Sequence, residues 1–215
     1  SLDQYGVNQY YERASLYGKY LSAIFVFLSP AAFLIGWFSA GTRPMQVTWS
    51  KLNRQANRLP DSVFWLGVPL AFSAWSAWTA WDTIGGIPRV FDAFNYWFQA
   101  KNFSLGQLYA PEPPLPELFR FPFIIMRDGK WYGSVYPGFS ILLSIGVKLG
   151  VPWLINPIIG GLALSGTFFL ARDMFNGKVA RLVVILGLVS PFFRMMSSIF
   201  MSHAAAILWV VIAMR

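Results

Sequence analysis

Asp92, Tyr96 and Gln99 occupy positions i, i+4 and i+7 of a segment that the sequence predicts to be a helix, so their side chains share one side of it. A carboxylate held beside phenol and amide groups is suited to accept a proton from a hydroxyl or an amine. Asp92 is also suited to cap the helix, because free backbone N–H groups and the helix dipole favour an acid in the first turn. The residues alone leave both interpretations of Asp92 open.

Three cations further along the same polar stretch are candidates for binding a phosphate. Arg127 and Lys130 flank Asp128-Gly129, a pair typical of hairpin turns, so a hairpin would bring the two cations close together. Arg120 precedes them in the chain. Cationic side chains hold phosphate oxygens through charge-assisted hydrogen bonds, although solvated positions in a turn are their commoner use.

The chain between these candidates is rich in proline, and residues 110–117 are expected to be extended and stiff, as a rigid loop over a site or as a spacer.

His203 lies in an apolar segment, where a polar group often marks a functional site. A solvated position at the end of that segment is the alternative. The chain has no cysteine and one histidine, so the sequence predicts no metal site and no cofactor.

Composition identifies the class of protein. Hydrophobic residues make up 56% of the chain and charged residues 12%, whereas soluble domains have about 45–50% and about 25%. The formal net charge is +8, and the basic residues gather beside apolar runs. Anionic lipid headgroups explain this placement better than nucleic acid does. The composition predicts a membrane protein whose partners include membrane lipids and exclude nucleic acid.

Apolar runs long enough to cross a bilayer predict an all-α polytopic membrane protein with about five transmembrane helices, at residues 20–40, 63–81, 154–171, 182–193 and 198–214. A shorter apolar segment, residues 139–149, is expected to lie along the membrane surface with Lys148 near the headgroups. The long polar loop of residues 82–136 contains the predicted helix of Asp92.

The basic residues also predict an orientation. The loops at 42–61 and 172–181 carry four and three basic residues, which favours the cytoplasmic side for both. The 82–136 loop is then extracytoplasmic in a multi-pass protein of the plasma membrane. Two domains are expected: residues 1–61, with one extra span and a basic loop, and residues 62–215, which form the transmembrane module with the long loop.

Seven short motifs follow one another in residues 63–215: Phe91-Asp-Ala-Phe-Asn-Tyr-Trp-Phe-Gln-Ala-Lys101, Asp128-Gly-Lys-Trp-Tyr132, Tyr136-Pro-Gly138, Gly150-Val-Pro-Trp-Leu-Ile-Asn-Pro157, Leu170-Ala-Arg-Asp-Met-Phe175, Ser190-Pro-Phe-Phe193 and Met201-Ser-His203. Their order and spacing resemble the N-terminal part of GT-C-type membrane glycosyltransferases, of the protein O-mannosyltransferase and aminoarabinose-transferase kind. The resemblance differs in one detail, because Ala93 stands where the family usually has a second, adjacent acid.

The resemblance implies transfer of a sugar from a polyprenyl-phosphate carrier to an acceptor on the extracytoplasmic face, with Asp92 as the general base. Tyr96, Gln99, Arg120, Arg127, Lys130 and His203 are then the candidate substrate-binding residues. Family members have more spans than this sequence shows. The chain is therefore expected to be a piece of a longer enzyme, or a shortened, inactive relative that serves as an accessory subunit of a larger membrane complex, respiratory or photosynthetic, with other membrane subunits as partners.

Overall fold

Two long apolar helices run through the part of the chain that the structure describes. The structure is a computed structural model and describes residues 59–215. The first long helix, Val63–Thr83, consists of η2 (Val63–Gly67), α4 (Val68–Trp78) and η3 (Thr79–Thr83), and the second is α7 (Pro152–Met174). With 21 and 23 residues, both are long and apolar enough to cross a membrane. The expected span at 20–40 and residues 42–58 of the first basic loop lie outside the described residues.

The expected spans at 182–193 and 198–214 differ from the observed helices. Helix α8 (Gly177–Val189) ends before Ser190, and α9 (Pro191–Ser198) continues at an angle of 64° to it. Pro191 has no N–H with which to extend the hydrogen bonds of α8, and the Ser190 side chain caps α9 by accepting a hydrogen bond from the Phe193 N–H, at 3.3 Å. Helix α10 (His203–Met214) follows. Residues 59–215 thus contain two candidate spans, or three if α8 and α9 form one broken span, and the total of five stays a prediction.

The polar loop forms a separate layer of mixed structure. It contains α5 (Phe91–Ser104), β1 (Ala110–Pro111), η4 (Pro116–Phe119), β2 (Ile124–Arg127) and β3 (Lys130–Gly133), and α6 (Pro137–Lys148) follows it. The strands are antiparallel in the order β1-β3-β2. The predicted hairpin is confirmed, because Asp128 and Gly129 form its turn, with φ of 54° and 72°. The proline-rich stretch was expected to be extended to residue 117, which is wrong for Pro116 and Glu117, since both lie in the 3-10 turn η4.

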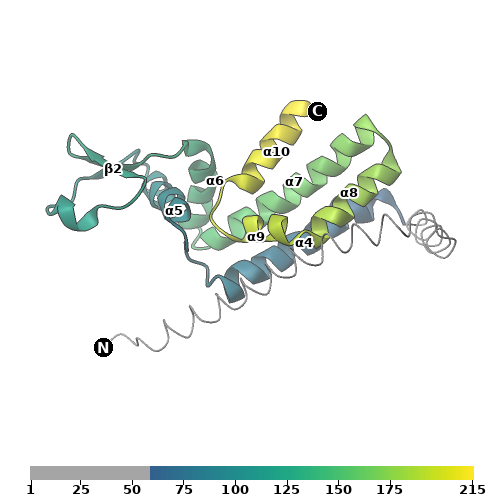
Figure 1. Cartoon of the computed structure of the whole chain (residues 1–215), viewed down its shortest axis with the longest axis horizontal. Coiled ribbons are helices and arrows are strands. Elements are labelled where there is room, and N and C mark those ends of the chain that lie inside the picture. The colour runs from purple at the N-terminus through teal and green to yellow at the C-terminus, as the bar shows by residue number, and fades with distance from the viewer. Residues whose placement is uncertain (1–58) are drawn as a thin grey trace, which may run out of the picture. The chain divides into compact units, whose positions relative to one another are not determined.

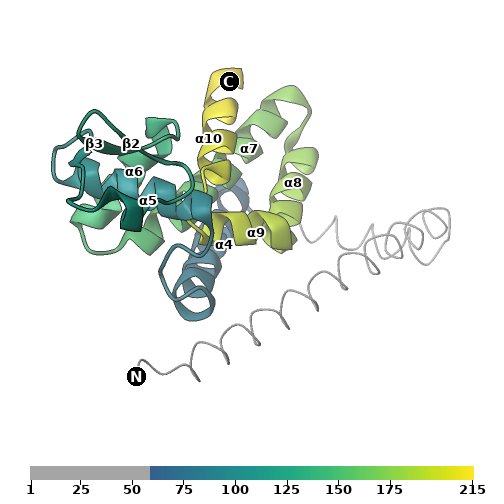
Figure 2. The same cartoon turned by 60° about the vertical axis from the view of Figure 1, so that its left-hand side comes forward.

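Helix α7 is the central element of the described chain, because it contacts α4, α6, α8, α9 and α10. Figures 1 and 2 show α5, α6 and the strands together at one end of α7, and the connection between α7 and α8 at the other end. Helix α5 packs on α6, and α6 packs on α7. A core cluster that includes Ala93, Phe139 and Ile159 joins these three helices.

Small residues allow α7 to pack closely on α4 and α9. A Cβ added at Gly161 would meet Ser73 Oγ and lie 3.0 Å from the Pro69 carbonyl oxygen, both in α4, and one added at Gly160 would lie 2.5 Å from Ser197 Oγ in α9. A side chain at either glycine would therefore push the helices apart, and close packing at small residues is typical of helix pairs inside membranes.

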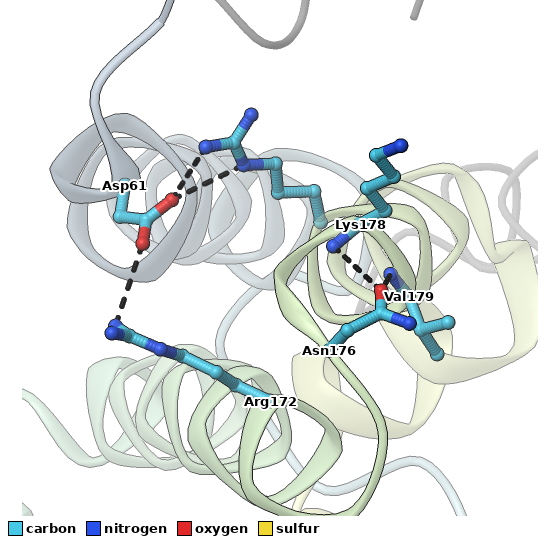
Figure 3. Close-up of polar contacts among 6 residues, drawn as sticks. Asp61, Arg172, Asn176, Lys178 and Val179 are labelled. Carbon is cyan, nitrogen blue, oxygen red and sulfur yellow. Dashed lines mark hydrogen bonds and ion pairs between the residues drawn. The ribbon is translucent and has the colours of Figure 1, made fainter.

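Ion pairs join the helix ends opposite the polar layer (Figure 3). The Asp61 carboxylate accepts hydrogen bonds from Arg181 Nη2 at 2.7 Å and Nε at 3.1 Å, and its other oxygen lies 3.4 Å from Arg172 Nη1. A further pair joins Arg215 Nε to Asp173 Oδ2, at 3.2 Å. These contacts fix the start of the first long helix to α7 and α8, and the end of α10 to α7.

Candidate functional site

Three amide side chains form a buried stripe along α5. Asn95, Gln99 and Asn102 are spaced i, i+4 and i+7, and all three are at least nine-tenths buried. Asn95 Nδ2 donates to the Phe123 carbonyl at 2.7 Å, and Gln99 Nε2 donates to the Val135 carbonyl at 3.3 Å. Their carbonyl oxygens, Asn95 Oδ1 and Gln99 Oε1, and the Asn102 Nδ2 group have no hydrogen-bond partner among the described residues.

A pocket of about 460 Å³ opens between α5 and the β2–β3 hairpin. Gln99, Arg127 and Lys130 line it together with Tyr109 and Tyr132. The structure therefore brings together three of the residues that the sequence singled out for substrate binding. The predicted hairpin supplies the reason, because its turn places Arg127 and Lys130 opposite each other as a cross-strand pair.

The pocket has two exposed cations, Arg127 and Lys130, at its rim. Arg127 Nε lies 3.5 Å from Asp128 Oδ2, and both side chains are largely exposed. The Lys130 ammonium lies 5.0 Å from the centre of the Tyr109 ring. The two cations exceed the one acid, so the pocket suits an anion, whereas the unpartnered carbonyl oxygen of Gln99 is buried.

Asp92 lies about two turns before Gln99, near the start of α5. The N-cap residue of the helix is Val90, and no side chain caps this end, so Asp92 lies in the first turn as expected but makes no capping hydrogen bond. Its half-buried carboxylate has no hydrogen bond or ion pair within the described chain. Asp92 is therefore available for chemistry at the start of α5.

Tyr96, one turn after Asp92, connects α5 to the membrane helices. Its hydroxyl group lies 2.9 Å from Ser202 Oγ, in the connection just before α10, and its ring packs edge-on against Phe139 of α6. His203, the first residue of α10, is exposed and lines an apolar pocket of about 560 Å³ between α8, α9 and α10. Tyr96 therefore lies at the junction of α5 and the start of α10, whereas His203 belongs to the apolar pocket.

Arg120 belongs to neither group. It pairs with Glu117 at 3.2 Å, where both side chains are 76% exposed, and it lines a third hollow beside β2. The seven residues expected to form one site are thus divided between the hairpin pocket, the first turns of α5 with Asp92 and Tyr96, the apolar pocket with His203, and this hollow. The rise of 1.5 Å per residue along a helix separates Asp92 from Gln99 by about 10 Å, so a ligand that reaches both must lie lengthwise along α5.

Sequence reasoning missed part of this arrangement. Asn95, Gln99 and Asn102 are spaced i, i+4 and i+7 in the sequence. This spacing indicates that they share one side of the helix, and it could have identified Asn95 and Asn102. Tyr109 gave no local signal, because strand pairing brings it to the pocket. In residues 59–215, no group of three or more His, Cys, Asp or Glu side chains is placed to hold a metal ion.

Comparisons with known proteins found no family model, no curated protein and no solved structure that matches this chain. The candidate site therefore rests on the geometry of its own residues.

Proposed function

We propose that this chain is the N-terminal portion of a membrane glycosyltransferase that moves a sugar from a polyprenyl-phosphate carrier to a hydroxyl acceptor. The observation that carries the proposal is the position of Asp92. Its carboxylate has no partner in the described residues, and it lies one turn before Tyr96, which contacts the start of α10. An acid without a partner beside the ends of apolar helices is suited to meet a carrier whose tail lies in the membrane.

In the proposed reaction, the acceptor hydroxyl group gives its proton to the Asp92 carboxylate as its oxygen attacks the anomeric carbon. The new carbon–oxygen bond forms while the bond between the anomeric carbon and the phosphate oxygen breaks. The polyprenyl phosphate leaves with the electron pair of that bond. Arg127 and Lys130 would stabilise the phosphate, since charge-assisted hydrogen bonds strengthen as negative charge develops. Gln99 would contact the sugar from the wall of the hairpin pocket.

The arrangement of the chain supports an extracytoplasmic site. The polar layer with Asp92 and the ion pairs of Arg172 and Arg181 lie at opposite ends of α7 (Figures 1 and 3). If the basic end faces the cytoplasm, as the positive-inside rule favours, α5 and the hairpin face outward in the plasma membrane.

The test is transfer of radiolabelled sugar from a polyprenyl-phosphate donor by the complete gene product in proteoliposomes. The Asp92→Asn variant is expected to lose about 10²–10⁴-fold in rate, the usual contribution of a general base. Asp82→Asn is the matched control, because Asp82 is an exposed acid that precedes the same layer. If Asp92→Asn and Asp82→Asn retain the same rate as the unchanged protein, Asp92 is not the base.

A second candidate function, an accessory subunit of a larger membrane complex, is favoured by apolar side chains that lie outside the long helices. Leu105, Leu108 and Leu118 in the polar layer are each at least 73% exposed. Lipid explains exposed apolar side chains on a span, but in a water-facing layer they indicate a protein partner. Purification in mild detergent distinguishes the two functions: a subunit is recovered in fixed stoichiometry with a multi-subunit complex, and a monomer with transfer activity rejects this candidate.

A further inference from the structure

The outer edge of β2 has backbone groups that no neighbouring strand uses. In the order β1-β3-β2, strand β2 pairs with β3 on one side only. The Ser134 N–H donates to the Phe123 carbonyl at 2.9 Å, which makes these two residues a hydrogen-bonded pair of the hairpin. Because such pairs alternate along an antiparallel ladder, the next hydrogen-bonded pairs are Ile125–Tyr132 and Arg127–Lys130.

The residues between these pairs, Ile124 and Met126, direct their backbone groups away from β3. The Ile124 N–H confirms this direction, because it donates to the Phe121 carbonyl outside the sheet, at 3.2 Å. The N–H and C=O of Met126 and the C=O of Ile124 have no backbone partner on that side within residues 59–215. One donor and two acceptors therefore face outward with the spacing that an extended chain requires.

A hollow of about 700 Å³ lies along this edge, between β2 and the segment of residues 112–122. Phe121, Ile125 and Met126 contribute apolar surface to it, and Glu112, Glu117 and Arg120 contribute charges. Two phenylalanines next to the hollow, Phe119 and Phe123, are 47% and 53% exposed. Apolar surface and free backbone groups thus occur side by side in the same layer.

We propose that the edge of β2 binds an extended polypeptide segment of another protein, which adds a fourth strand to the sheet and places alternate side chains in the hollow. Edge strands are templates for this kind of pairing, in which main-chain hydrogen bonds give affinity and pockets for alternate side chains give specificity. A lipid tail fills apolar space but offers no hydrogen-bond partner for Met126. The two acids and one arginine of the hollow favour a segment with a basic side chain. This proposal is independent of sugar transfer.

The test uses the full chain in detergent micelles and a fluorescein-labelled peptide of alternating threonine and valine that ends in lysine. Met126→Pro removes the outward N–H, and an edge position that does not donate to the ladder tolerates proline. Met126→Leu is the control, because it keeps the N–H and a side chain of similar size. Fluorescence anisotropy is expected to show binding that Met126→Pro weakens by about tenfold, the equivalent of one hydrogen bond, and that Met126→Leu leaves unchanged.

Hydrogen exchange gives a readout that does not depend on the proline variant. The Met126 amide of the unchanged protein is expected to exchange more slowly when the peptide is bound, whereas the Ile125 amide, already bonded within the hairpin, is expected to change little. Absence of peptide binding, or equal binding by both Met126 variants, overturns the proposal. It is also overturned if Met126→Pro converts a dimer to a monomer and leaves peptide binding intact, since the edge would then pair with a second copy of this chain.

Discussion

The polar layer and the helix bundle each contain a buried asparagine, and the two are used differently. In the bundle, Asn156 Nδ2 donates to three backbone carbonyls, those of Met196, Ile199 and Met201, where the chain passes from α9 to α10. In the layer, Asn95 Nδ2 donates to Phe123, whose carbonyl also accepts from the N–H and the hydroxyl group of Ser134. Asn156 is thus the main donor for irregular backbone, whereas Asn95 adds to a group that is already paired.

The difference follows from the surroundings of the two regions. Irregular backbone among apolar helices has no water to complete its hydrogen bonds, so it persists only where side chains supply the partners. The layer leaves backbone groups unpaired at a sheet edge, such as those of Met126, where a ligand can reach them. The two regions can therefore be compared by making the same substitution, Asn to Leu, in each and measuring the loss in the free energy of unfolding.

The largest effect is expected for Asn156→Leu. This variant removes the described donors of the Met196 and Met201 carbonyls, and each buried group left unpaired costs about 1–3 kcal/mol. The free energy of unfolding, measured by SDS titration in mixed micelles, should fall by about 2–6 kcal/mol. A loss below that of Asn95→Leu would contradict the distinction between the two regions.

Gly161→Ala is expected to have the next largest effect. Its Cβ would meet the backbone carbonyl oxygen of Pro69 and the Ser73 hydroxyl group, so α4 and α7 would have to separate. Overpacking of this kind costs about 1–3 kcal/mol, which the same titration measures. Gly177→Ala in the first turn of α8 is the control, because a Cβ there meets no atom within 4 Å. Equal losses in the two variants would exclude close packing as the cause.

Asp61→Asn tests the ion pairs at the other end of the bundle. Arg181 is only 18% exposed and would lose a charged partner at 2.7 Å, which should lower the free energy of unfolding by about 1–2 kcal/mol. The exposed Lys178, outside these ion pairs (Figure 3), provides the control Lys178→Gln, which should be neutral. High salt should reduce the difference between Asp61→Asn and the unchanged protein; no dependence on salt would argue against an electrostatic origin.

The smallest effect is expected for Asn95→Leu. The Phe123 carbonyl keeps its two hydrogen bonds from Ser134, and the variant also removes the unpartnered Asn95 Oδ1. The net loss should be about 0.5–1 kcal/mol, the contribution of one ordinary hydrogen bond. Thermal unfolding followed by tryptophan fluorescence measures it. A loss as large as that of Asn156→Leu would show that the layer is as closed to water as the bundle.

Local signals predicted the elements of the layer well. The helix expected around Asp92 occurs as α5, the Asp128-Gly129 turn forms the expected hairpin, and the segment expected at 139–149 occurs as α6. Each of these depends on a few adjacent residues: the spacing of side chains along a helix, or a residue pair that adopts positive φ. The pairing of Arg127 with Lys130 followed directly from the hairpin.

Contacts between distant residues were not predictable in the same way. The bonds of Asn156 reach residues 40 to 45 positions away, and that of Asp61 to Arg181 spans 120 positions. Nothing near Asn156 or Asp61 indicates these partners, because they depend on how the helices pack. The break at Ser190 had a local signal in Pro191, but the apolar residues on both sides favoured one continuous span.

The ion pair between Asp173 and Arg215 has a consequence for topology mapping. Two groups 3.2 Å apart cannot be on opposite faces of a bilayer, so the chain is on the same side of a membrane before α8 and after α10. Reporter tags inserted after Phe175 and after Arg215 should therefore give the same accessibility to a membrane-impermeant reagent, whichever compartment that is.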